Sequence, residues 1–422
     1  MKLRLLAVSA LVLLPAIAGC GEDDSLNAPD LSNNGGLLQR YVSMGNSITA
    51  GWQSGGINDS TQQRSYAAMF AAAAGTPFFI PSLAMPGCPP PLVNNISLAR
   101  VGNGSPTTCA LRVDEHLPFV SNLGVPDANS YSVMDNQPPE AFSNALTTFI
   151  LGGRTQVQAM QDADPTFVSV WIGNMDVLPS VTNSTDPGTD ARVLPVATFQ
   201  ANYGAMLEAI DETGAEAVLI GVVNIGAIPY LSPGIIYYCL KNGGCPEPLP
   251  PQNPAIAAIP FTVAASCAPA VAGGLGETSL VPWPIGIGRI GAAAQGTPTS
   301  LDCAADADVV LAEEAGLINA AVTGYNTYIS QQAEQRGWAY FDPNPALFQL
   351  RQEGQIPAFP DISTLVTGGP ISFGPYFSLD GVHPSTLAHE AIADSVISAV
   401  NRTYDTNIPF VNPSEPTLRH AR

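Results

Sequence analysis

The chain has 422 residues and a formal net charge of −20 at pH 7, from 15 Lys and Arg against 35 Asp and Glu. Such an acidic surface excludes a nucleic acid partner held through the general electrostatic field of the protein. Because 46% of the residues are hydrophobic and only 12% are charged, the chain can bury a large core, and we expect one domain with a long insertion.

The first 19 residues have the pattern of a secretory signal peptide. A short basic region with Lys2 and Arg4 precedes the apolar run LLAVSALVLLPAIA, which is too short to span a bilayer comfortably. The end of the segment, IAGC at residues 17–20, resembles the lipobox of bacterial lipoproteins, in which the cysteine is acylated and becomes the mature N-terminus. The resemblance implies lipidation of Cys20. The alternative is a signal peptide that is cleaved nearby without lipidation.

Residues 20–38 are polar, acidic and rich in turn residues, which is typical of a flexible tether. We therefore expect a lipid-anchored protein at the bacterial cell envelope, tethered to the membrane but not embedded in it. The residue directly after the cysteine is Gly21, so the acidic retention signal is absent at this position. Its absence slightly favours the outer membrane of a Gram-negative cell. The membrane leaflet and the oligomeric state stay open.

Short β-like runs alternate with helical patterns in the rest of the chain. The expected strands are 40–44, 77–80, 166–172, 215–223 and 338–342. The expected helices are 62–75, 198–214 and 313–337, whose capping glycines are Gly75, Gly214 and Gly337. A last helix follows Pro384 and Ser385, with one buried stripe made of Ala388, Ile392, Val396 and Ala399. This alternation predicts an α/β fold with a parallel sheet, whose ligands gather at the carboxyl ends of the strands.

Residues from about 225 to 305 break the alternation, because Pro, Gly, Cys and aromatic residues dominate there. We expect a long irregular insertion that its cysteines keep ordered. If the lipid occupies Cys20, six cysteines remain, an even set that is typical of disulfides in an exported protein. Six cysteines allow fifteen pairings, of which local closure favours Cys88–Cys109, Cys239–Cys245 and Cys267–Cys303. Metal binding is the alternative, but no Cys-x-x-Cys or paired histidine accompanies them.

Ser47 follows the first expected strand, at the edge where ligands gather. A serine hydroxyl becomes a nucleophile when a base takes its proton, and the base needs a third group that fixes its tautomer. The chain has four histidines: His116, His383, His389 and His420. Only His383 has a carboxylate three residues before it, Asp380, on a turn that leads into a helix. An isolated Asp-x-x-His would more often be a turn with a solvated histidine. Thr49 excludes the Gly-x-Ser-x-Gly elbow of the α/β-hydrolases.

Together these stretches resemble the GDSL lipases and esterases, also called SGNH hydrolases. The matching blocks are GNSI at 45–48, the glycine of LAMPG at Gly87, GNMD at 173–176 and DGVH at 380–383. The resemblance implies a flavodoxin-like α/β/α sandwich of three layers with a mostly parallel five-stranded sheet. The hydrolase domain would cover residues 39–405, with a C-terminal tail at 406–422.

The resemblance also implies roles for the residues. Ser47 would attack an ester carbonyl, His383 would act as base and then acid, and Asp380 would orient the imidazole. The backbone N–H groups of Ser47 and Gly87 and an asparagine side chain would hold the oxyanion.

Two positions depart from the family pattern. Met175 occupies the place of the oxyanion asparagine, so either two backbone donors suffice or Asn174 reaches in through a local shift, and we favour Asn174. Asn46 replaces the aspartate of the motif name, and we expect it to satisfy backbone groups on the turn.

The sequence thus predicts a serine hydrolase that cleaves carboxylic esters of small molecules or lipids. The alternative, from another class, is a weak or inactive surface lipoprotein of the same fold that binds lipids or glycans. Aromatic residues of the insertion could line an acyl-binding cleft or form core, namely Tyr230, Tyr237, Tyr238, Phe261 and Trp283. No metal or cofactor is expected, and the identity of the ester stays open.

Overall fold

The structure, a computed structural model, describes residues 36–111, 117, 119–135 and 145–412. The predicted signal peptide, Cys20, most of the tether and the end of the C-terminal tail lie outside these residues, as do His116 and His420. Within the described residues, no helix has the length and apolar character needed to cross a membrane. The lipid anchor therefore stays a prediction.

A parallel sheet of four strands forms the centre of the molecule. Its order is β1 (Tyr41–Gly45), β4 (Phe167–Trp171), β5 (Glu216–Ile220) and β10 (Ala339–Phe341). All residues of β1 and β4 are buried, as expected of strands that are covered by helices on both faces. Four of the five predicted strands are therefore present: β1 is shifted by one residue, and the other three are shorter than predicted.

The fifth predicted strand, 77–80, does not form. A single parallel bridge between Ser43 and Asn122 extends the sheet beyond β1 instead. The segment 77–80 lies beside this bridge: the Phe79 carbonyl accepts hydrogen bonds from the N–H groups of Ser121 and Asn122, and the Phe78 ring stacks on Tyr41 of β1. The apolar run PFFI predicted a buried strand, but Pro77 is exposed and residues 78–80 are only half-buried. The neighbour of β1 on this side comes instead from a segment more than 40 residues later in the chain.

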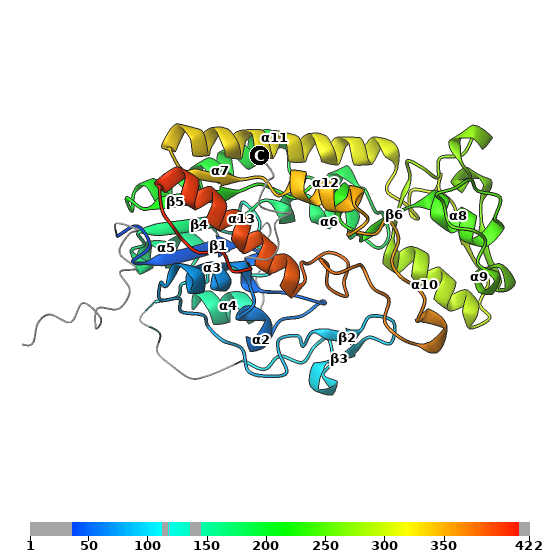
Figure 1. Cartoon of the computed structure of the whole chain (residues 1–422), viewed down its shortest axis with the longest axis horizontal. Helices are drawn as coiled ribbons and strands as arrows, with labels where there is room; N and C mark the ends of the chain where they lie inside the picture. The colour runs from blue at the N-terminus through cyan, green and yellow to red at the C-terminus, as the bar shows by residue number, and fades with distance from the viewer. Residues whose placement is uncertain (1–35, 112–116, 118, 136–144, 413–422) are drawn as a thin grey trace, which may run out of the picture.

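Helices cover both faces of the sheet and complete the three layers. One face packs against α3 (Tyr66–Ala74) and α13 (Thr386–Tyr404). The other packs against α5 (Gln156–Ala163), α7 (Val196–Asp211) and α11 (Ala312–Arg336), as Figure 1 shows for the long α11. The predicted α/β/α sandwich is confirmed.

Local capping signals set several helix ends as predicted. Gly75 and Gly337 end α3 and α11 in the left-handed conformation, with φ of 67° and 72°. The Ser385 side chain caps the start of α13 by accepting from the Ala388 N–H. Gly214 is the exception, because α7 ends at Asp211, three residues earlier.

The insertion forms a lobe at one end of the molecule, on the right in Figure 1. It contains more regular structure than predicted: β6 (Leu231–Pro233), α8 (Gly234–Asn242), α9 (Pro254–Ala258), β7 (Phe261–Val263), β8 (Leu280–Pro282), α10 (Trp283–Ala294) and β9 (Thr299–Leu301). Strands β6 and β8 pair antiparallel, whereas β7 and β9 pair parallel. These strands are too short to produce a clear period in the sequence.

Three disulfides are present, and they are the three predicted pairs: Cys88–Cys109, Cys239–Cys245 and Cys267–Cys303. The last two lie in the insertion, whose buried side chains form a hydrophobic cluster of their own with α12 and residues near 371–388. The remaining short elements are α1 (Ser47–Ala50), α2 (Asp59–Gln62), β2 (Leu92–Asn94), β3 (Ala99–Arg100), α4 (Ala145–Leu151), α6 (Leu178–Val181) and α12 (Asn344–Gln352).

Candidate active site

Ser47 lies on a tight turn between β1 and the short helix α1. A Cβ atom on Gly45 would lie 1.9 Å from the Oγ1 atom of Thr49, so only glycine fits there. Both backbone groups of Gly45 are bound by the Gln156 amide, at 3.0 and 2.9 Å. The Oδ1 atom of Asn46 accepts a hydrogen bond from the Ile48 N–H, which is the capping role predicted for this residue. The turn therefore fixes the serine at the carboxyl end of β1.

The structure brings Ser47, His383 and Asp380 together in one chain of hydrogen bonds. The Oγ atom of Ser47 lies 2.8 Å from Nε2 of His383, and Nδ1 of His383 lies 2.9 Å from Oδ2 of Asp380. Ser47 is 7% exposed, and the side chains of His383 and Asp380 are 15% and 16% exposed. Such an arrangement allows the imidazole to accept the serine proton while the carboxylate holds its opposite N–H.

Asp380 is held by several donors in addition to the imidazole. Its oxygens accept from the N–H groups of Gly55, Val382 and His383, at 2.7 to 2.9 Å, and from the Ser378 hydroxyl at 3.2 Å. Burial raises the pKa of Asp380, but the charge of His383 and the hydrogen bonds from His383 and Val382 outweigh it and lower the pKa to about 2. The carboxylate is therefore ionised at neutral pH.

Asn174 presents a free amide donor at the carboxyl end of β4. Its Oδ1 accepts from the Val223 N–H at 2.9 Å, which leaves Nδ2 as the free end of the amide. Nδ2 is buried and has no hydrogen-bond partner among the described residues. The preceding Gly173 has φ of 124°, and a Cβ there would lie 2.4 Å from Val222 Cγ2. The motif thus turns sharply at the glycine and directs its asparagine inward.

Gly87, the predicted backbone donor, packs against a different loop. A Cβ atom on it would lie 2.2 Å from the Ile57 carbonyl oxygen, and its own carbonyl accepts from the Ala110 N–H. None of the contacts found for Gly87 in the described part of the chain involves Ser47.

The segment that follows the Ser43–Asn122 bridge runs beside the end of β1. The Val125 N–H donates to the Gly45 carbonyl at 3.1 Å, and Asp127, two residues later, has φ of 69°. The side chain of Asp127 lies near enough to His383 for the two charges to interact. None of the sequence motifs described above includes this segment. The short run NLGVP at 122–126, which ends in a turn residue, was the available signal.

The family model for GDSL-like lipase/acylhydrolase matches residues 41–396, which include β1, the serine turn and the DGVH block. The chain belongs to this family. It is accordingly a carboxylic ester hydrolase. No curated protein compared with the sequence matches it.

Two solved structures resemble this GDSL-like hydrolase over most of its length. One is a catalytic mutant of Axe2, an acetylxylan esterase from Geobacillus stearothermophilus, with 10% identity, a TM-score of 0.36, and coverage of 87% of this chain and 95% of that one. The other is a second mutant of Axe2, described as an acetyl-xylooligosaccharide esterase, with 11% identity, a TM-score of 0.38 and the same coverage. Both TM-scores are too low to carry an argument about the substrate.

The insertion of this GDSL-like hydrolase contacts the site through Trp283. The indole Nε1–H donates to the Asp380 carbonyl at 3.0 Å, and the ring packs against Phe373. An apolar pocket lies next to Ile48, the residue after the serine, but none of the aromatic residues of the insertion that were proposed to line a cleft is among its lining residues. Tyr237 and Phe261 are fully buried in the core of the lobe.

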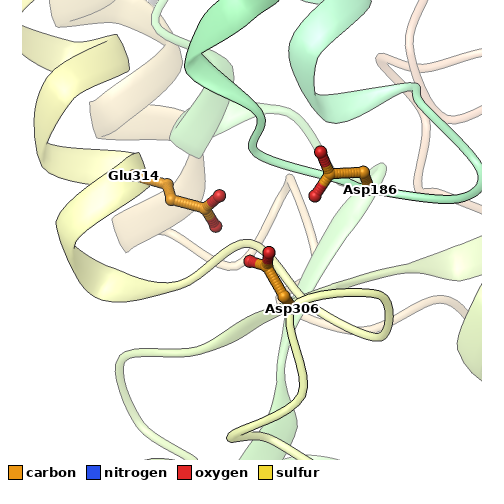
Figure 2. A group of neighbouring side chains, drawn as sticks. All are labelled: Asp186, Asp306 and Glu314. Atoms are coloured by element: carbon orange, nitrogen blue, oxygen red, sulfur yellow. The ribbon is translucent and has the colours of Figure 1, made fainter.

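Three carboxylates form a cluster away from the serine: Asp186, Asp306 and Glu314, whose ligand atoms lie within 4.8 Å of one another (Figure 2). Oxygen ligands of this kind suit a hard divalent cation such as Ca²⁺. However, Glu314 also accepts the Leu311 N–H at the start of α11, which gives it a structural role. Exposed acidic clusters are common without a metal, and we assign no ion to this one.

Proposed function

We propose that Ser47 is the nucleophile of this ester hydrolase, with His383 as general base and acid and Asp380 as its orienting group. The observation that carries the proposal is the continuous hydrogen-bonded chain from the Ser47 hydroxyl through the imidazole to the carboxylate. The low pKa of Asp380 supports it, because an ionised carboxylate keeps Nδ1 protonated and Nε2 free to accept.

Each half-reaction follows from this geometry. The Ser47 Oγ bonds to the ester carbonyl carbon while Nε2 of His383 takes its proton. The same proton then passes to the leaving alkoxide, which departs as the alcohol and leaves an acyl-serine. Water next attacks this acyl group and loses its proton to Nε2, and the proton returns to Ser47 as the carboxylic acid is released.

Three donors are available for the oxyanion. Two are the Ser47 N–H and Nδ2 of Asn174, which make no hydrogen bond within the described part of the chain. The third is the Asp127 N–H, which also has no partner there and follows the segment paired with the end of β1. In this proposal Asp127 takes the role that the sequence suggested for Gly87.

The alternative function, an inactive lipoprotein that binds lipids or glycans, had its best support in Met175. The free Nδ2 of the neighbouring Asn174 removes that support, because the oxyanion donor need not come from position 175. Membership of the GDSL-like family also favours hydrolysis.

Labelling with a fluorophosphonate probe tests the nucleophile directly. The full chain should be labelled on the peptide that contains Ser47, and Ser47→Ala should abolish both labelling and ester hydrolysis. Ser398→Ala, on the outer part of α13, is the matched control and should label normally. Labelling that persists in Ser47→Ala would reject the assignment.

The second part of the proposal is attachment to the cell envelope through lipidated Cys20, and it rests on the sequence alone. Cys20→Ser should move the full-length protein from the membrane fraction to the soluble fraction after cell lysis, while labelling of Ser47 persists. Continued sedimentation with membranes would contradict a lipid tether.

A further inference from the structure

An apolar pocket adjoins the serine on the side of α13. It has a volume of about 100 Å³ and lies between the first half of α13, helix α12 and the carboxyl ends of β4 and β10. Its walls include Leu178, Val223, Ile228, Leu347, Phe377 and Ile392. The insertion contributes only its first residues, so the pocket belongs mainly to the central domain.

The pocket offers almost nothing to a polar group. Four of its lining residues carry a polar side-chain atom, namely Trp171, Asn174, Tyr376 and Ser395. The Trp171 indole N–H is already used, because it donates to the Gly221 carbonyl at 3.0 Å. The Ser395 hydroxyl is already used, because it donates to the Ala391 carbonyl at 2.8 Å within α13. No charged side chain lines the pocket, so a charged or hydroxylated group would lose its hydration there without compensation.

Residues next to the proposed nucleophile and base line the pocket. Ile48, the residue after the serine, lines it, and so do Val382 and Pro384 on either side of His383. The Asn174 amide, the proposed oxyanion donor, lines it as well. A carbonyl placed between Ser47 and Asn174 therefore has one substituent at the entrance to the pocket.

We propose that this pocket binds the acyl chain of the substrate, so that the enzyme prefers esters of apolar carboxylic acids to acetate esters. The inference rests on the proposed role of Ser47. An apolar cavity of roughly 150 Å³ accommodates benzene, so a pocket of about 100 Å³ has room for on the order of four to six carbons. An acetyl group would leave it unfilled.

The expected signature is a rise of kcat/KM with acyl length. Each methylene transferred from water to an apolar pocket should raise kcat/KM by about fourfold, up to the length at which the pocket is full. Hydrolysis of p-nitrophenyl acetate, butyrate and hexanoate by the full chain in lipid nanodiscs measures this, because nanodiscs avoid detergent that would enter the pocket. Equal kcat/KM for all three esters would overturn the proposal.

A filled pocket provides the second arm of the test. Leu347→Trp should lower the ratio of hexanoate to acetate kcat/KM by at least about tenfold, because the indole occupies space that the chain needs. The matched control is Leu317→Trp, at an exposed position of α11, which should keep the wild-type ratio. An unchanged ratio in Leu347→Trp would contradict the assignment.

Binding to a variant that cannot turn over separates this inference from the proposed function. Calorimetric titration of Ser47→Ala should show binding of hexanoate with a Kd at least about tenfold lower than that of acetate. If the wild type hydrolyses no ester, the proposed function fails while this titration still decides on the pocket. Equal affinity for the two carboxylates would overturn the pocket.

Discussion

The amide of Asn174 is oriented by one hydrogen bond, from the Val223 N–H to Oδ1, which leaves Nδ2 as the donor that we propose for the oxyanion. Asn174→Ala should therefore lower kcat by about 100- to 1,000-fold, the usual cost of one oxyanion donor. Met175→Asn should add nothing, because the donor is already supplied. Steady-state kinetics of both variants on one ester measure this, and unaltered turnover in Asn174→Ala would exclude it as a donor.

Substitutions of Asp127 test whether catalysis depends on its backbone N–H or on its carboxylate. Its φ of 69° suits glycine and is costly for a β-branched residue. Asp127→Gly should keep kcat near the wild-type value, whereas Asp127→Val should lower it by about tenfold or more by moving the N–H. Turnover lost in the glycine variant would show that the carboxylate itself is needed.

At the scale of elements, the insertion meets the active site where α10 begins. Its first residue, Trp283, donates to the carbonyl of Asp380, whose side chain holds the imidazole. The backbone N–H of Trp283 donates to the Tyr230 carbonyl, so the lobe fixes the backbone from which the indole reaches Asp380. The lobe therefore acts as a support for the turn that carries Asp380 and His383.

Removing this support should slow catalysis without preventing binding. Trp283→Phe keeps the aromatic contact with Phe373 but loses the hydrogen bond, so kcat should fall by about two- to tenfold while KM changes little. Trp338→Phe is a suitable control, because this tryptophan packs against Arg336 at the end of α11. A kcat for Trp283→Phe equal to that of the control would refute a positioning role.

At the scale of the whole molecule, two buried groups outside the reacting centre make stability depend on pH in opposite directions. Burial raises the pKa of Asp176 to about 7, although its hydrogen bonds from Ser130 act the other way. Burial, followed by the charge of His383, lowers the pKa of His389 to about 3. The His389 Nδ1 accepts from the Tyr66 N–H, which requires the neutral ring.

Proton linkage sets the direction in which each group changes the stability with pH. Folded Asp176 keeps its proton between about pH 4 and pH 7 while the unfolded chain has lost it, so its contribution to stability falls as pH rises through this window. Neutral His389 contributes in the opposite sense, and its contribution is lost as pH falls below about 6.5.

Comparison with Asp176→Asn isolates the carboxyl group. The variant keeps an oxygen that can accept from Ser130 but does not ionise. Its free energy of unfolding relative to the wild type should therefore increase between pH 4 and pH 7, by on the order of a few kcal/mol. Urea unfolding at several pH values measures the difference, and a difference that does not vary with pH would contradict the prediction.

Features that depend on neighbours along the chain could be predicted from the sequence alone. Ser385 and the glycines after α3 and α11 fixed helix ends because capping is local. The three disulfides joined the closest available cysteines. The family blocks pointed to Ser47, Asp380 and His383 because the strand and turn signals around them are local. The fold joins these three side chains by hydrogen bonds, although Ser47 lies more than 300 residues before the other two.

Which segments meet at the edge of the sheet depends on long-range packing and could not be predicted from the sequence. Burial signals are similar in 77–80 and in the run before Asp127, and nothing local states which of them pairs with β1. The apolar pocket has the same origin, because its walls come from helices and loops that are more than 300 residues apart in the chain. Such contacts depend on how packed layers close over one another, and sequence periodicity records only that a side chain is buried and not which partner buries it.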